Sequence, residues 1–312
     1  MSDAIETFPC FGGRCSVRVS GEGDGDDAAA AADEAKRALL AAHATLSRFD
    51  PDSELSRLNR DPRHEVPASP LLRRLVAGAL SAGLRSGGLV DATLVDEIEA
   101  AGYADSREFG GVAERPAPPP PHAGGPSPRS GWCELSVDER AGTVSRPPGV
   151  RIDPGGIAKG LMADEIAEAL ADFPAFAVDC CGDLRVGGVD ARMRTILVDD
   201  PIGGPPLHEL RISEGAVATS GITRRSWIDG EGLGAHQILD PATGRPAYTG
   251  VIQATAVAPT GLLAETLAKS ALLVGPERAG SQLPFGGVVV EEAGEVRVFD
   301  SLAPLAPAGL VA

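Results

Sequence analysis

Basic residues are scarce in this sequence. The 312-residue chain has 28 lysines and arginines against 44 aspartates and glutamates, which gives a formal net charge of −16. Nucleic acids and anionic membranes bind basic surfaces, so this balance argues against both as general partners. A phosphate-bearing small molecule is still compatible with it, because the backbone amides at a helix start attract anions locally.

Cysteines and long apolar runs are also lacking. There are five cysteines, an odd number with one adjacent pair, and none has the C-x-x-C spacing of zinc ligands. No apolar run approaches the ~20 residues of a membrane-spanning helix. The N-terminal stretch lacks the basic and apolar regions of a signal peptide. We therefore expect a cytoplasmic protein without membrane insertion, disulfide framework or cysteine zinc site.

The spacing of apolar residues predicts more strands than helices. Helices are expected from about residue 28 to 49, after Pro70, at 157–172 and at 262–274. Strands are expected at 15–21, on both sides of 141–142, and at 175–181, 192–200, 216–220, 250–258 and 286–300. The hairpin-like connections favour an α+β fold with a mostly antiparallel sheet and flanking helices. A single domain is expected over 1–312, with a proline- and glycine-rich surface excursion at about 113–130.

The segment "RIDPGGIAKG" joins a predicted strand to a predicted helix. Gly155 and Gly156 let the backbone approach a ligand, and the helix start offers unpaired amides. Lys159 in the first turn opposes the helix dipole unless it meets an anion. The segment is neither a P-loop nor a G-x-G-x-x-G loop, so a phosphate contact and a tight turn with a surface lysine both stay open.

For several other polar residues, the sequence is compatible with a ligand contact and with a purely structural role. Asp183 follows one apolar strand and Thr219 ends another. Glu265 and Lys269 are four residues apart on one predicted helix, which is the spacing of a surface ion pair. His236, in "GAHQILDPATGRP", is one of only five histidines. A core histidine, a metal ligand and an acid/base group are all open for it.

Eight segments, in this order, resemble the ApbE-like family of FAD:protein FMN transferases, often labelled thiamine-biosynthesis lipoproteins. They are "FPCFGGRCSVRV", "LSRFDPDSELSRLN", "SGGLVDATLVDEIEAAGY", "DPGGIAKG", "CGDLRVGG", "VATSG", "HQILDPATGRP" and "AETLAKSALLVG". The resemblance covers nearly the whole chain. It implies a two-lobed, T-fold-like architecture that binds FAD between its lobes, usually with Mg²⁺.

The resemblance also implies a reaction and its residues. A threonine hydroxyl of an acceptor protein attacks the FMN-side phosphorus of FAD, and AMP leaves. Phe49 is implied to lie by the flavin or adenine, and His236 to deprotonate the acceptor or orient the phosphate, which suits an ordinary histidine pKa of about 6.5. The further FAD contacts that it implies are Leu89, Val90, Asp91, Asp153, Lys159, Asp183 and Thr219.

The sharpest departure from the family pattern lies in "AETLAKSA", which aligns with the metal-binding "ADALATA". Glu265 and Lys269 replace its Asp and Thr, and the backbone at Gly156 is the other implied metal contact. A charged ammonium has no lone pair for Mg²⁺, so we expect Lys269, held by Glu265, to take the cation's place at the pyrophosphate. FAD binding should then survive EDTA. An FAD pyrophosphatase and a non-catalytic flavin-binding protein are the alternative functions.

Overall fold

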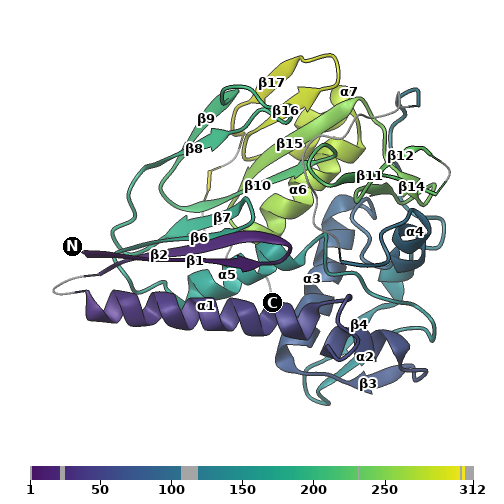
Figure 1. The fold of residues 1–312 in the computed structure, drawn as a ribbon, viewed down its shortest axis with the longest axis horizontal. Helices are drawn as coiled ribbons and strands as arrows, with labels where there is room; N and C mark the ends of the chain where they lie inside the picture. The colour runs from purple at the N-terminus through teal and green to yellow at the C-terminus, as the bar shows by residue number, and fades with distance from the viewer. Residues whose placement is uncertain (1, 22–24, 107–118, 231, 303, 306–312) are drawn as a thin grey trace.

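An eight-stranded sheet forms the centre of the molecule (Figure 1). The computed structural model describes residues 2–21, 25–106, 119–230, 232–302 and 304–305. The sheet order is β1 (Ser2–Cys10), β2 (Gly13–Gly21), β6 (Ala175–Cys180), β7 (Asp183–Gly187), β10 (Gly215–Gly221), β15 (Val251–Ala258), β16 (Gly287–Glu291) and β17 (Val296–Phe299). Its neighbouring strands all pair antiparallel, so the predicted α+β class with a mostly antiparallel sheet is confirmed.

Three helices pack side by side against this sheet. Helix α1 (Asp26–Leu46) packs on β1 and β2, α5 (Ala158–Ala169) on β6 and β7, and α6 (Gly261–Leu273) on β10 and β15. The sequence of α1 explains this packing. Its buried residues recur every three or four positions and are mostly alanine, so one narrow face lies close to the strands. Among the described residues, no helix is both long and apolar enough to cross a membrane.

Strand alternation also gives the sheet a second buried face. Ala216 and Ala218 of β10 pack with Ala264 of α6, whereas Val217 between them packs with Val186 and Val257. That second cluster is joined by apolar residues of the hairpin β8 (Arg194–Val198) and β9 (His208–Ile212). Residues with odd and even numbers on β10 therefore face different layers, as the pleat of a strand requires.

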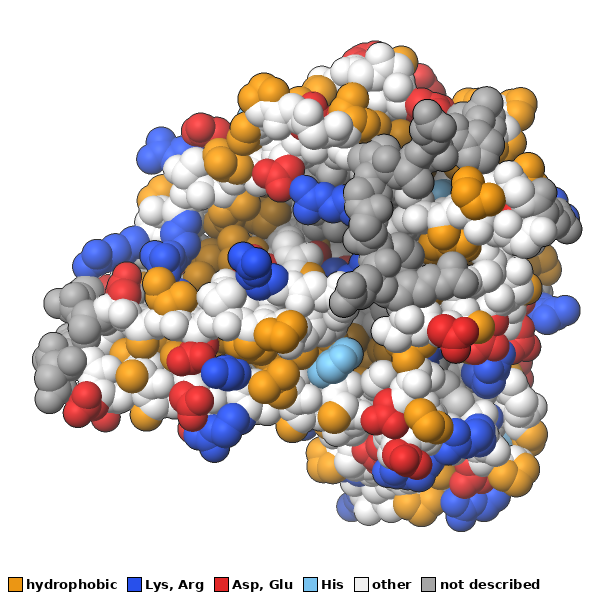
Figure 2. All heavy atoms as spheres, in the orientation of Figure 1, with side chains coloured by type: hydrophobic (Ala, Val, Ile, Leu, Met, Phe, Trp, Pro, Cys, Tyr) orange, Lys and Arg blue, Asp and Glu red, His pale blue; other side chains and the backbone are white. Residues whose placement is uncertain are grey.

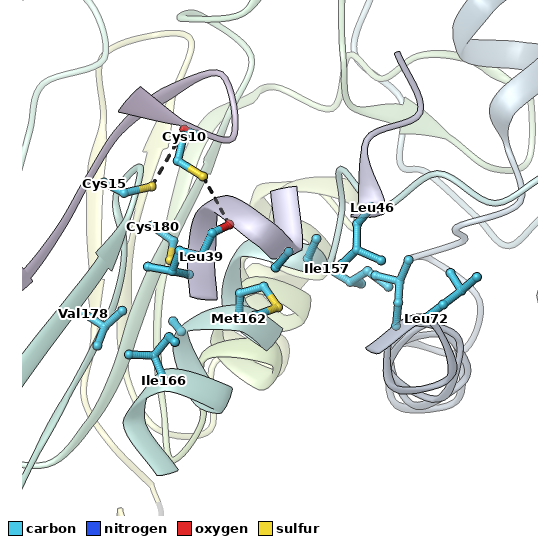
Figure 3. Close-up of a cluster of buried hydrophobic side chains, with 14 of the residues drawn as sticks. Cys10, Cys15, Leu39, Leu46, Leu72, Ile157, Met162, Ile166, Val178 and Cys180 are labelled. Carbon is cyan, nitrogen blue, oxygen red and sulfur yellow. Dashed lines mark hydrogen bonds between the residues drawn. The ribbon is translucent and has the colours of Figure 1, made fainter. Parts of the chain in front are cut away.

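A smaller group of helices and short strands lies beside the sheet layer (Figure 1). It contains α2 (Glu54–Arg60), α3 (Pro70–Ser86), α4 (Val95–Ala100), η1 (Gly131–Glu134) and a sheet of β3 (Glu65–Pro67), β5 (Thr143–Ser145) and β4 (Ser136–Asp138). Figure 3 shows the buried cluster that joins the two parts, from Val178 through Met162 and Ile157 to Leu72 of α3. The remaining short elements are β11 (Ser226–Ile228), β12 (Gly234–His236), β13 (Leu239–Asp240), β14 (Arg245–Pro246), α7 (Pro276–Ala279) and η2 (Gly280–Gln282).

The predicted excursion at 113–130 falls partly on residues 113–118, which lie outside the described residues. From Pro119 to Ser130 the chain is irregular but held by backbone contacts. The His122 amide donates to the carbonyl of Tyr248 at 2.8 Å, and the Gly124 amide donates to that of Leu273 at 2.7 Å. This part of the connection is therefore anchored to the end of α6 and to the segment that follows β14.

Asp164 of α5 holds the first turn of α6. Its carboxylate accepts hydrogen bonds from the amides of Gly261 at 2.6 Å and Leu262 at 2.9 Å. Burial raises the pKa of Asp164 to about 6, although both amides and Arg185 act in the opposite direction. The folded-state pKa thus lies above the unfolded-state value of 3.8. The resulting stabilisation is complete below that value and is lost as the pH rises through about 6.

We therefore expect the free energy of unfolding of the wild type to fall as the pH rises from about 4 to about 7. This fall should be absent in Asp164→Asn. The shift corresponds to at most about 3 kcal/mol. Urea unfolding of the wild type and the variant across this range measures the difference. A variant that keeps the wild-type slope would show that another group produces it.

Candidate active site

A cavity of about 500 Å³ opens between the large sheet and the smaller group of helices. Its walls come from the end of α1, the segment after α3, the start of α5, the ends of β6 and β10, and one face of α6. Nine residues predicted for the site line it, namely Phe49, Leu89, Val90, Asp91, Asp153, Gly156, Lys159, Thr219 and Lys269. Residues separated by more than 200 positions in the sequence therefore meet in one place.

Two tight hairpin turns contribute to the cavity wall. Phe11 and Gly12 connect β1 to β2, and Cys181 and Gly182 connect β6 to β7. All four residues have positive φ, as two-residue turns of this hand require. For Phe11 and Cys181 this left-handed backbone costs roughly 1–2 kcal/mol each. Strain of this kind is typical of functional sites.

Two buried carboxylates and two half-buried ammonium groups form the polar side of the cavity. Lys159 Nζ pairs with Asp183 and lies 3.6 Å from Glu265 Oε1, and Lys269 Nζ lies 2.9 Å from the same Oε1. Both carboxylate side chains are 1% exposed, whereas both lysine side chains are 16% exposed. The predicted residues Asp183 and Glu265 are therefore not in the cavity wall but directly behind the two ammonium groups.

The electrostatics of this charged cluster favour the ionised forms of Glu265 and Lys159, whereas burial raises the pKa of Asp183 to about 6 despite the charge of Lys159. Burial alone would raise the pKa of Glu265, but Lys269, Lys159 and the Gly160 amide outweigh it and hold that pKa at about 2. Burial acts to lower the pKa of Lys159, and the charges of Asp183 and Glu265 raise it above its usual value. Acidic and basic side chains are intermingled on the face shown in Figure 2. In the cavity, by contrast, the ammonium groups of Lys159 and Lys269 line the open space, and the carboxylates of Asp183 and Glu265 lie behind them.

An aromatic wall lies at another side of the cavity. The rings of Phe49 and Tyr103 have centroids 5.3 Å apart, and Trp227 continues the row at 5.4 Å from Tyr103. The Arg48 guanidinium lies 4.2 Å from the centre of the Phe49 ring and donates to Asp153 Oδ2 at 2.6 Å. Flat faces and a fixed guanidinium are suited to stacking a planar ring. Neither Arg48 nor Tyr103 was predicted for the site, although Arg48 directly precedes the predicted Phe49.

Unsatisfied polar atoms cluster in this cavity. Among the described residues, five buried side-chain atoms have no hydrogen-bond partner. Three of them belong to cavity-lining residues: Arg48 Nη1, Asp91 Oδ2 and Gln237 Oε1. Arg48 Nη1 lies 3.8 Å from Glu99 Oε1 as an ion pair. Because buried polar groups rarely stay unpaired, the two oxygens indicate a ligand with hydrogen-bond donors. Burial also raises the pKa of Asp91, despite its hydrogen bonds from Thr93.

His236 lies in the protein interior at the end of β12 and is 2% exposed. Its Nε2 lies 3.0 Å from the carbonyl oxygen of Ala247, and its Nδ1 accepts from the amide of Ile238 at 3.3 Å. The neighbouring Gln237 lines the cavity instead. A catalytic role for His236 therefore stays a prediction, and Gln237 is a further cavity-facing residue that was not predicted from the sequence.

Comparisons with known proteins agree with this architecture. The family model described as "ApbE family" matches residues 11–284. A FAD:protein FMN transferase of Haemophilus influenzae is 26% identical over 264 residues, covering 79% of this chain and 73% of the relative. One of Salmonella typhimurium is 24% identical over 255 residues, covering 78% and 71%.

Two solved structures share the fold. The crystal structure of the ApbE protein of Thermotoga maritima has a TM-score of 0.78 at 23% identity, covering 96% of this chain and 97% of that chain. The flavinyl transferase ApbE of Pseudomonas stutzeri has a TM-score of 0.73 at 20% identity, covering 99% and 98%. The match over 11–284 and the shared fold confirm the resemblance seen in the sequence, and the chain belongs to the ApbE family.

Proposed function

We propose that this protein is an FAD:protein FMN transferase that moves FMN from FAD to a threonine hydroxyl of an acceptor protein and releases AMP. The observation that carries the proposal is the cavity itself, whose lining combines two ammonium groups with an aromatic wall. A dinucleotide has two flat rings joined by a pyrophosphate, and these features complement the two kinds of wall. The relatives that carry this activity in their names support the same function.

The cavity residues divide the work of binding and transfer. Lys159 and Lys269 neutralise the pyrophosphate, and Phe49 with Arg48 holds one ring system. The threonine oxygen forms a bond to the FMN-side phosphorus while the bond from that phosphorus to the bridging oxygen breaks. AMP leaves with the bridging oxygen, and the hydroxyl proton passes to a base or to water. Positioning and charge neutralisation account for most of the catalysis in such a displacement.

Gln237 is placed to orient the attacking hydroxyl. Its Nε2 donates to the carbonyl of Gly221 at 3.3 Å, and its Oε1 is one of the buried atoms without a partner. An amide oxygen accepts a hydrogen bond from a hydroxyl but does not take up the proton at neutral pH. His236 contributes in this arrangement by holding the β12 segment through the Ala247 carbonyl. We expect it to act as a positioning residue.

Paired substitutions separate these two roles. We expect Gln237→Leu to slow transfer about 10-fold, the loss of one hydrogen bond in the transition state, with little change in stability. We expect His236→Ala to lower the free energy of unfolding by about 1–3 kcal/mol, because the Ala247 carbonyl loses its donor. Urea unfolding and the pH profile of transfer are measured for both. A His236→Ala variant that folds normally and loses an acid limb of the profile would establish His236 as the base.

The Mg²⁺ that the family resemblance implies does not fit the residues present. Glu265 Oε1 accepts from Lys269, and its Oε2 accepts from the Gly160 amide at 2.9 Å. Within the described ranges, no three His, Cys, Asp or Glu side chains are grouped as a metal site. A cationic ammonium beside this carboxylate oxygen repels a divalent ion and cannot ligate it.

The proposed activity is tested by incubating the protein with FAD and a candidate acceptor domain. Intact mass of the acceptor and AMP in solution are measured, and an acceptor with the target threonine changed to alanine is the control. An FMN-sized increase in mass together with AMP release supports the transferase. AMP and free FMN without acceptor would instead identify the FAD pyrophosphatase, and bound flavin without AMP would identify a non-catalytic flavin protein.

The partners follow from this proposal. We propose FAD and a threonine-bearing cytoplasmic protein as the two substrates. The net charge of −16 disfavours nucleic acid as a third partner.

A further inference from the structure

Lysine is used very selectively in this chain. Only three lysines, at positions 36, 159 and 269, are present among the 28 basic residues, and the others are arginines. Two of the three, Lys159 and Lys269, lie in the cavity and share Glu265. An ammonium is a compact, strongly hydrated point charge, whereas a guanidinium is a broad planar fork. In size and charge distribution, the ammonium is thus the side-chain group closest to a metal ion.

Lys269 is directed to the glycine-rich loop at the start of α5. A Cβ on Gly156 would lie 3.5 Å from Lys269 Cε, so the glycine leaves the space in which the lysine stem lies. The charge of Lys269 therefore stands beside the loop whose amides precede α5, at the wall that Gly155 and Gly156 form. Loop amides and an adjacent ammonium are the two components of a phosphate site.

The carboxylate of Glu265 fixes this ammonium without blocking it. Its hydrogen bond to Lys269 occupies one of three ammonium donors, and the carboxylate lies behind the lysine with respect to the cavity. The second carboxylate oxygen is tied to the backbone of Gly160. The position of Lys269 is therefore set before any ligand enters.

We propose that the Lys269 ammonium is the resident cation of this site and makes the binding of a nucleotide pyrophosphate independent of divalent metal. This inference rests on the proposed function, because it assigns one of the two positive charges that face the phosphates of FAD. Nucleotide binding by this chain would then differ from the metal-dependent binding that the family resemblance implies, and Lys269 would be the residue responsible for the difference.

The test compares two flavins under two conditions. Binding of FAD and of riboflavin, which has no phosphate, is measured by flavin fluorescence with Mg²⁺ and with EDTA. We expect the wild type to bind FAD equally well in both. Lys269→Met should weaken FAD about 10- to 100-fold in EDTA, the loss of a charge-assisted hydrogen bond, and leave riboflavin unchanged. Lys36→Met changes the remaining lysine, which lies on α1 paired with Glu6, and should change neither affinity.

Each contrary result identifies which statement fails. FAD binding that is lost in EDTA and restored by Mg²⁺ would overturn the role of Lys269 and leave the proposed function standing. This arm uses only the wild type, so it holds even if Lys269→Met folds poorly. Equal weakening of FAD and riboflavin in Lys269→Met would assign the residue a structural role. Absence of FAD binding under both conditions would overturn the proposed function itself.

Discussion

Lys159→Met is expected to lose FAD binding and to lower the free energy of unfolding by about 3–5 kcal/mol, the cost of breaking a buried ion pair. The variant leaves Asp183, which is 1% exposed, without its contacting ammonium, and removes one of two cations from Glu265. Methionine keeps much of the length of the lysine stem, so the loss comes from charge more than from packing. Urea unfolding and flavin fluorescence measure the two effects.

The double variant Lys159→Met with Asp183→Asn separates stability from binding. Removing the unpaired carboxylate should recover a large part of the lost stability, because the buried charge has gone. FAD binding should not recover, because the cavity still lacks the ammonium group of Lys159. A single variant that loses less than about 1 kcal/mol would show that Asp183 becomes neutral or hydrated at little cost. Recovery of FAD binding in the double variant would show that Lys159 only balances Asp183.

The repeating apolar patterns predicted the main elements well, and weaker patterns were missed. The alanine and leucine stripe of α1 and the turn at residues 141–142 both have clear local signals, and the structure has a helix and a hairpin there. Strand β1 was missed because it is an edge strand with few fully buried residues. Helix α2 has only seven residues, and its clearest signal is the Ser53 cap that accepts from the Ser56 amide. Short elements depend on such caps and on tertiary contacts more than on periodicity.

The site was harder to predict where tertiary position decides a side chain's role. The alternation of a strand is recognisable in "GAHQILDP". The sequence does not show whether the even-numbered or the odd-numbered side chains face the cavity, because a shift of one residue exchanges the two faces. The structure buries His236 and places Gln237 in the cavity wall. Arg48 gains its role from Asp153, 105 positions away, so no local pattern marks it. Lys159 was identifiable because a lysine in the first turn opposes the helix dipole. Lys269 has the spacing of an ordinary surface ion pair, and its place in the site came from the family resemblance.

The close crossing of α5 and α6 holds the charged cluster together. A Cβ on Gly160 would lie 2.4 Å from the carbonyl oxygen of Gly261, and one on Gly261 would lie 2.5 Å from the carbonyl oxygen of Gly160. Both obstacles are backbone atoms, so no side-chain rotation relieves them. The same crossing brings the Gly160 amide to Glu265 and therefore sets the distance between Lys159 and its second carboxylate.

Gly160→Ala should therefore lower the free energy of unfolding by about 3 kcal/mol or more, the upper part of the range for overpacking a tight contact. Gly78→Ala is the matched control, because Gly78 also lies within a helix and faces α6, but its Cβ would meet Leu262 Cδ2 at an ordinary 3.5 Å. Alanine there should instead add roughly 0.5–1 kcal/mol, since glycine is unfavourable inside a helix. Thermal or urea unfolding of both variants tests the contrast. Equal effects of the two methyl groups would mean that α5 and α6 separate easily, and the charged cluster would then need another source of rigidity.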